Sequence, residues 1–91
     1  MPLLFMLGRI VATPGALDAM SRSSQSVGEF LAKHARGEWG ELDAFDTQAN
    51  SAAIRDGSRI LSSYTTRQNE VIWVITEADR TSTCLLLPCE Y

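Results

Sequence analysis

The chain has few of the residues on which catalytic and metal sites are usually built. Its 91 residues include two cysteines and one histidine. A closed zinc site needs four ligands of this kind, and a disulfide framework needs more cysteines at wider spacing. We expect Cys84 to be a small hydrophobic residue within a strand and Cys89 to be exposed after Pro88. Both thiols are predicted to be reduced, and we expect no metal ion and no cofactor.

Basic residues are also scarce, and they are scattered. Lys33 is the single lysine, the seven arginines form no cluster, and the net charge is −3. Proteins that bind nucleic acid usually carry a basic stripe, so this pattern argues against such a partner. Nucleic-acid binding would require Arg9, Arg55, Arg59 and Arg67 to gather on one face. The acidity is too weak for a mimic of DNA, which needs acidic side chains over most of its surface.

Long apolar runs and targeting signals are absent as well. No stretch reaches the ~20 residues of a membrane-spanning helix. Residues 1–7 are apolar but lack the basic residues and the cleavage pattern of a signal peptide. We therefore expect a cytoplasmic protein without membrane contact. With 45% hydrophobic and 21% charged residues, the composition is that of an ordinary globular protein, and a chain of 91 residues predicts one domain, 1–91.

The last third of the chain predicts a sheet. Two apolar runs, 71–75 and 84–87, are separated by a polar segment, which is typical of paired strands buried on both faces. We predict three strands that form an antiparallel meander: 59–66, 70–76 and 81–87. The middle strand should be central, and we predict that Trp73→Ala costs about 3–5 kcal/mol of stability.

The first half of the chain predicts one strand and three helices. Residues 7–12 form the strand, and Thr13 and Pro14 suit the start of a helix over 14–20. Ser26 and Glu29 have the spacing of a capping box, for a second helix that ends near Arg36. A third helix follows from a cap at Asp43 to Asp56-Gly57. Its buried stripe is predicted to contain Leu42, Phe45, Ala49, Ala52 and Ala53.

The order β-α-α-α-β-β-β predicts the α+β class, with an antiparallel four-stranded sheet packed against helices on one face. The first strand must return to a sheet edge, beside the third or the fourth strand. The sequence does not choose between these two positions.

His34 is the one candidate for acid–base chemistry. An imidazole can be a general base near neutral pH, and Glu38 or Asp79 could complete such a site. However, His34 shares a helix face with Phe30 and Leu31. This arrangement favours a structural histidine, half-buried and bonded to a backbone carbonyl, over a catalytic one.

Two acidic segments are candidates for binding. Glu38, Glu41, Asp43 and Asp46 lack the spacing of a calcium loop and suit the start of a helix. Trp39, among them, is either a lid over the core or an anchor for a protein partner. A hairpin tip at residues 77–80 is either a solvated turn or a recognition loop. The candidate binding residues are therefore Glu38, Trp39, Glu41, Glu77, Asp79 and Arg80.

The segment 13–16 is a weaker candidate. It follows a strand and opens a helix, which is where anions bind to free backbone N–H groups. It lacks both the Gly-x-Gly spacing and the lysine of a phosphate loop.

Taken together, five segments resemble a family of small uncharacterised bacterial proteins that are frequent on plasmids and other mobile elements. These segments are GRIVATPGA (8–16), EFLAKH (29–34), GEWG (37–40), WVITEADR (73–80) and LLLP (85–88). Family members are labelled plasmid-related protein, or sometimes subunit M of a type I restriction enzyme. The second label does not fit the chemistry, because the chain is too short for a methyltransferase domain. It also lacks a Gly-rich cofactor loop and an Asn/Asp-Pro-Pro-Tyr/Phe motif.

From the resemblance we expect a non-enzymatic protein-interaction module carried by bacterial mobile elements. It would bind a protein partner, as an inhibitor of a host defence system (antirestriction or anti-CRISPR) in one specific version. A homodimer formed through a sheet edge or a helix face is a second form of association. The alternative is a small enzyme or ligand-binding domain that uses His34 with nearby carboxylates.

Overall fold

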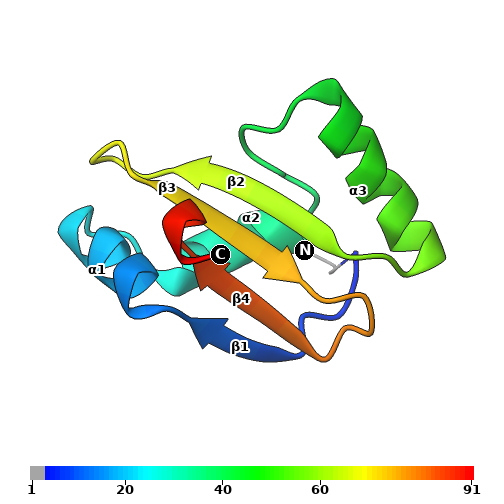
Figure 1. Ribbon diagram of the computed structural model, residues 1–91, viewed down its shortest axis with the longest axis horizontal. Helices are drawn as coiled ribbons and strands as arrows, with labels where there is room; N and C mark the ends of the chain where they lie inside the picture. The colour runs from blue at the N-terminus through cyan, green and yellow to red at the C-terminus, as the bar shows by residue number, and fades with distance from the viewer. Residues whose placement is uncertain (1–3) are drawn as a thin grey trace.

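The structure is a computed structural model that describes residues 4–91 (Figure 1). In chain order the elements are β1 (Arg9–Ala12), α1 (Pro14–Arg22), α2 (Val27–Ala35), α3 (Ala44–Asp56), β2 (Ile60–Thr65), β3 (Val71–Thr76), β4 (Ser82–Leu86) and the short 3-10 helix η1 (Pro88–Glu90). The predicted α+β order is confirmed. The three predicted caps are also confirmed, because Thr13, Ser26 and Asp43 each accept a hydrogen bond from a backbone N–H in the first turn of the helix that follows.

The four strands form one mixed sheet in the order β1-β4-β3-β2. β3 pairs antiparallel with both β2 and β4, as predicted, but β1 runs parallel to β4. The prediction of a purely antiparallel sheet is therefore wrong. The reason is the helical connection between β1 and β2, which crosses one face and re-enters the sheet at the opposite edge in the same direction. β4 runs in that direction too, because two hairpins separate it from β2.

Helices α1 and α2 cover one face of the sheet and enclose the main core with it. Figure 1 shows α2 behind the strands and α1 beyond their ends. Side chains at alternate strand positions point to this face, as the period of a strand requires. The buried residues of this core are Ala16, Ala19, Met20, Phe30, Tyr64, Ile72, Val74 and Leu85.

The opposite face of the sheet carries much less cover. In Figure 1, η1 and the C-terminus lie in front of β3. Trp73 on this face is half-buried, and its ring meets the ring of Tyr91 edge-on at 5.8 Å between centroids. Val71, also on this face, is 38% exposed. The prediction that β3 is buried on both faces is therefore wrong for its first half.

Helix α3 lies beside the outer edge of β2 instead of over the sheet (Figure 1). The Asn50 side chain donates to the Leu61 carbonyl at 2.5 Å and accepts from the Leu61 N–H at 3.1 Å, as a neighbouring strand would. The buried stripe of α3 is narrow and contains Asn50 and Ala53. The predicted stripe is wrong for Phe45 and Ala49, which are exposed.

Candidate binding surfaces

Trp39 anchors the link between α2 and α3, residues 36–43, to the core. Its side chain is 8% exposed and belongs to a second core with Phe5, Ala53 and Ile60. The Trp39 ring lies 5.9 Å from that of His34, centroid to centroid. Of the two interpretations of Trp39, the structure gives the lid over the core. Trp39 therefore does not present its ring to a partner, contrary to its place among the candidate contact residues.

The backbone of this link extends the sheet at the outer edge of β2. The Ser63 N–H donates to the Trp39 carbonyl at 3.0 Å, and the Glu41 N–H donates to the Ser63 carbonyl at 2.7 Å. Gly40, between them, has a φ of +75°, and a Cβ at this position would collide with the Ser63 carbonyl. A glycine is thus required for the link to approach β2 so closely. The Tyr64 hydroxyl adds a hydrogen bond to the Glu38 carbonyl.

The acidic side chains of the link point to solvent. Glu38 accepts a hydrogen bond from the Arg36 guanidinium at 2.6 Å, which lowers the pKa of this carboxyl. Glu41 is exposed, and within residues 4–91 its carboxylate has no hydrogen-bond or ion-pair partner. Asp43 accepts from the Asp46 N–H at 2.8 Å and begins α3. The expectation that Asp43 caps a helix is confirmed, and the link presents a row of carboxylates.

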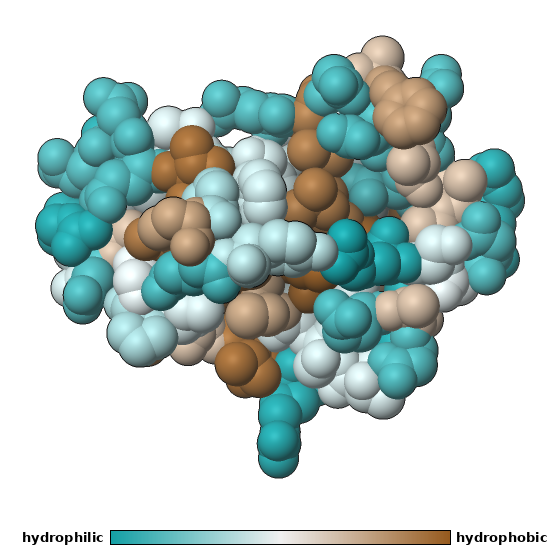
Figure 2. Space-filling model, in the orientation of Figure 1, coloured by the Kyte–Doolittle hydropathy of each residue, from teal (hydrophilic) through white to brown (hydrophobic). Residues whose placement is uncertain are grey.

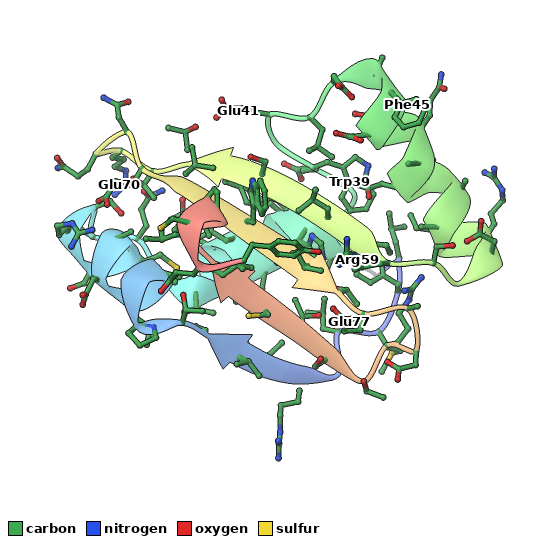
Figure 3. All side chains as sticks on the ribbon, viewed as in Figure 1. Trp39, Glu41, Phe45, Arg59, Glu70 and Glu77 are labelled. Carbon is green, nitrogen blue, oxygen red and sulfur yellow. The ribbon has the colours of Figure 1, made fainter. Side chains whose placement is uncertain are left out.

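Phe45 stands out from this acidic segment. Its side chain is 79% exposed, the largest fraction among the large hydrophobic residues that the structure describes. Figure 3 shows Phe45 on the outer side of the first turn of α3, with Trp39 on the inner side of the link. At the same place, Figure 2 shows an apolar residue among hydrophilic neighbours. The helical period predicts a buried Phe45, so Phe45 is not among the predicted contact residues.

Arg80 at the β3–β4 hairpin tip has a structural role. Its guanidinium donates to the carbonyls of Ser58, Glu77 and Ala78 and, at 2.9 Å, to that of Ala53 at the end of α3. The same group lies over the Phe5 ring, 5.7 Å from its centroid. Arg80 adopts a left-handed backbone with φ of +61°. Arg80 therefore ties the tip to α3.

The remaining tip residues border an open hollow. Glu77, Ala78, Asp79 and Thr81 line a depression of about 240 Å³. Asp79 accepts from both the hydroxyl and the N–H of Thr81, and these bonds lower its pKa. In Figure 3, Glu77 lies at the opposite side of the molecule from Glu41. The two predicted acidic segments are therefore separate and do not form one site.

His34 is fully buried, with 0% exposure, between α2 and the sheet. The Thr83 hydroxyl donates to the Leu7 carbonyl at 2.7 Å, so it accepts from Thr76, 2.7 Å away. Because the Thr76 hydroxyl donates its hydrogen to Thr83, it accepts a hydrogen bond from Nε2 of His34 at 2.9 Å. Nδ1 is then the acceptor for the Ser62 hydroxyl at 2.5 Å. These directions fix the neutral tautomer with the proton on Nε2.

This environment makes His34 a poor base. Burial lowers its pKa to about 4, because the charged imidazolium would lose its hydration. Both ring nitrogens are bonded to hydroxyl groups, and neither Glu38 nor Asp79 is hydrogen-bonded to the ring. The geometry thus gives no support to a pairing of His34 with a carboxylate.

The start of α1 already holds an anion of the chain itself. The Glu90 carboxylate accepts from the Thr13 hydroxyl, from the Gly15 N–H at 3.1 Å and from the Leu87 N–H at 2.9 Å. These bonds lower the pKa of Glu90. The expected anion site at residues 13–16 is thus filled by Glu90 from η1. No local pattern links these positions, and only Pro88, which follows β4 and opens η1, indicates that the chain turns back here.

The cysteines and arginines add no further cluster. Cys84 and Cys89 are both free, Cys89 is exposed as expected, and burial raises the pKa of Cys84. Arg59 donates to the Tyr91 hydroxyl, and Arg67 donates to the Ser23 carbonyl.

Within residues 4–91, no three His, Cys, Asp or Glu side chains are placed to hold a metal ion. In the same range, no helix has the length and apolar character to cross a membrane.

Comparisons with known proteins returned no match: no family model, no curated protein and no solved structure is significantly similar to this chain.

Proposed function

We propose that this chain is a protein-binding module, and that its partner docks on the segment from Glu38 to the first turn of α3. The observation that carries the proposal is the exposure of Phe45. Burying a phenylalanine side chain contributes roughly 1.5–3 kcal/mol, and here this surface stays in water. Aromatic residues are typical anchors at protein interfaces.

The segment is joined to the rest of the fold at several points. Trp39 is buried beneath it, Gly40 and Glu41 are joined to the edge of β2, and Asp43 caps the helix that carries Phe45. A surface ordered in advance loses little conformational entropy on binding, which favours affinity. Phe45 therefore has the support that an interface anchor needs.

The charge around Phe45 defines the partner. Glu38, Glu41 and Asp43 are exposed, Glu38 is paired with Arg36, and no lysine or arginine lies in residues 37–54. Complementary charge mainly increases the association rate and the specificity. The expected partner is a protein with an apolar pocket for Phe45 and a basic rim around it.

A comparison of the proteins that different variants capture tests this surface. Phe45→Ala removes the anchor without disturbing the core, and Leu17→Ala on α1 is the matched control, because Leu17 is 48% exposed. Immobilised chains would be used to capture proteins from a bacterial lysate, with quantification by mass spectrometry. A basic protein should be retained by the parent and by Leu17→Ala, and lost at least tenfold with Phe45→Ala. The proposal would be contradicted if Phe45→Ala retained every protein as well as the parent does.

The biological setting that we propose follows from the resemblance to plasmid-related proteins. There the module would be carried by a mobile element and would inhibit a restriction or CRISPR system of the host. Expression of the chain should then raise the transformation efficiency of an unmodified plasmid in a restricting host, and Phe45→Ala should abolish the increase. An unchanged efficiency in hosts with each type of system would exclude this setting but not the binding surface.

A further inference from the structure

Strand β1 leaves one edge of the sheet open. The Arg9 N–H donates to the Thr81 carbonyl at 2.9 Å, and the Thr13 N–H donates to the Leu85 carbonyl at 3.0 Å. Backbone groups of a strand alternate in direction, so the N–H and C=O groups of Ile10 and Ala12 point away from β4. Within residues 4–91 these outward groups have no hydrogen-bond partner.

The two edges of the sheet differ in this respect. At the outer edge of β2, the backbone of Leu61 is bonded to Asn50 and that of Ser63 to the link. At β1, Ile10 and Val11 are 42% and 43% exposed. Figure 2 shows one apolar group at the lower margin, where Figure 1 places β1, beside a hydrophilic side chain that extends below it. An open, apolar edge is a template for pairing with another strand.

We propose that β1 pairs with β1 of a second copy of this chain, antiparallel about a two-fold axis at Val11. In this register Ile10 lies opposite Ala12 of the other copy, and the reverse pair completes the symmetry. All outward N–H and C=O groups of Ile10 and Ala12 are then bonded. The two Val11 side chains meet at the axis on the face that carries η1.

The ends of β1 select this register over its neighbours. A shift in one direction places Ala12 opposite Gly8, whose φ of +67° takes it out of the extended conformation. A shift in the other direction places Ile10 opposite Pro14, which has no N–H group to donate. Each shift leaves outward groups unpaired, so the register centred on Val11 is the one that satisfies the edge completely.

Charge supports a second copy as the occupant. The register places Arg9 opposite Thr13 of the other copy, on the face that carries η1. The Thr13 hydroxyl is bonded to the Glu90 carboxylate, so Glu90 of one copy comes beside Arg9 of the other. Arg9 is exposed and, within the described range, forms no ion pair. Two symmetric ion pairs follow, and the two Arg9 side chains stay apart.

The interface is small, which sets the expected strength. Standard protein interfaces bury about 800 Å² on each partner, and a strand of four residues provides less. The dimer should therefore form at high protein concentration, dissociate on dilution and weaken at high salt, because ion pairs at an exposed edge are screened.

Sedimentation equilibrium over a concentration series tests the proposal. The average mass of the parent should rise from 10.0 kDa towards twice this value. Arg9→Glu places a like charge beside Glu90 at each end of the interface and should weaken association at least tenfold. Arg55→Glu is the matched control, because Arg55 is an exposed arginine on α3 and the change in net charge is the same. It should associate like the parent.

Ile10→Pro tests the backbone pairing itself. Proline is accepted on an edge strand where its nitrogen faces solvent, so the variant should melt close to the parent. It cannot donate to the second copy and should remain monomeric. The proposal is overturned if the parent stays monomeric up to about 1 mM, or if Arg9→Glu and Ile10→Pro associate as tightly as the parent. Phe45→Ala should not affect the dimer, so this proposal and the proposed binding surface can fail separately.

Discussion

At the scale of single residues, His34 shows how a polar side chain can be accommodated in a small core. The sequence predicts a structural histidine bonded to a backbone carbonyl. The ring instead joins the hydroxyls of Ser62 and Thr76, and the chain of bonds ends on the Leu7 carbonyl through Thr83. A fully satisfied network of this kind fixes one arrangement of the core. The signal for this network in the sequence was the presence of these hydroxyl residues at core-facing positions of the strands.

The pKa of His34 predicts a loss of stability in acid. The group has a pKa of about 4 in the folded chain and 6.5 as a model value. Between these values the unfolded chain binds a proton that the folded chain does not, so the free energy of unfolding decreases as the pH falls from 6.5 to 4. The decrease should reach about 3 kcal/mol, since each pKa unit is worth about 1.4 kcal/mol.

Urea unfolding at a series of pH values measures this decrease. His34→Gln is the control, because the ionisable group is gone and its share of the pH dependence should disappear in the same window. A parent and a variant with parallel pH profiles between 6.5 and 4 would contradict the assignment. Nitrogen chemical shifts of this single histidine should also report a proton on Nε2.

Arg80 gives a second prediction for a single side chain. Hydrogen bonds from a charged group contribute about 1.5–3 kcal/mol, and Arg80 donates to carbonyls of both the hairpin tip and α3. Arg80→Ala should therefore lower stability by about 2–3 kcal/mol in chemical denaturation. Arg80→Gly loses the same bonds but relieves the left-handed backbone, and it should be the less damaging change. A melting temperature unchanged in both variants would mean that Arg80 does not anchor the tip.

At the scale of elements, α3 is where sequence periodicity and structure differ most. Leu42, Phe45, Ala49 and Ala52 follow a helical period, and the period predicts that they share a face. It does not say which face is buried. The choice is made by Asn50, whose amide pairs with the backbone of β2 and turns Phe45 to solvent. Such a side-chain bond to a strand edge has no local sequence pattern.

Asn50 should accordingly matter more than any exposed residue of α3. Asn50→Ala leaves the N–H and C=O of Leu61 without partners and should cost about 1–3 kcal/mol. Gln48→Ala, at an exposed position of the same helix, is the control and should change stability by less than about 0.5 kcal/mol. Equal denaturation midpoints for the two variants would refute the role of Asn50. The variant should also aggregate more readily, because the β2 edge becomes open.

At the scale of the whole molecule, local signals predicted the elements but not their assembly. The caps at Thr13, Ser26 and Asp43 and the two hairpins are local, and each lies where the sequence indicates. The parallel pairing of β1 with β4 joins residues far apart in the chain, and no short pattern encodes it. Of the candidate site, the acidic side chains of Glu38 and Glu41 were predicted, but their aromatic neighbour at the surface is Phe45 instead of Trp39.

The unequal cover of the two sheet faces predicts unequal costs of truncation. Phe30 is 1% exposed in the core under α2, and Phe30→Ala should cost about 3–5 kcal/mol. Trp73 lies half-buried on the other face against Tyr91, so Trp73→Ala should cost less, about 2 kcal/mol, and not the 3–5 kcal/mol that the sequence indicated. Thermal unfolding of both variants would measure this order. A larger loss for Trp73→Ala would mean that the face under η1 is the main core.

The pairing of β1 with β4 also sets when the chain can fold in the cell. During synthesis β1 leaves the ribosome well before its partner β4, Ser82–Leu86, because three helices and two other strands lie between them in the chain. The nascent chain therefore cannot complete its sheet while β4 is still in the exit tunnel. Contacts between distant segments also slow folding. Until β4 has emerged, β1 has no partner strand on either of its edges, and this interval is when the young polypeptide depends most on chaperones.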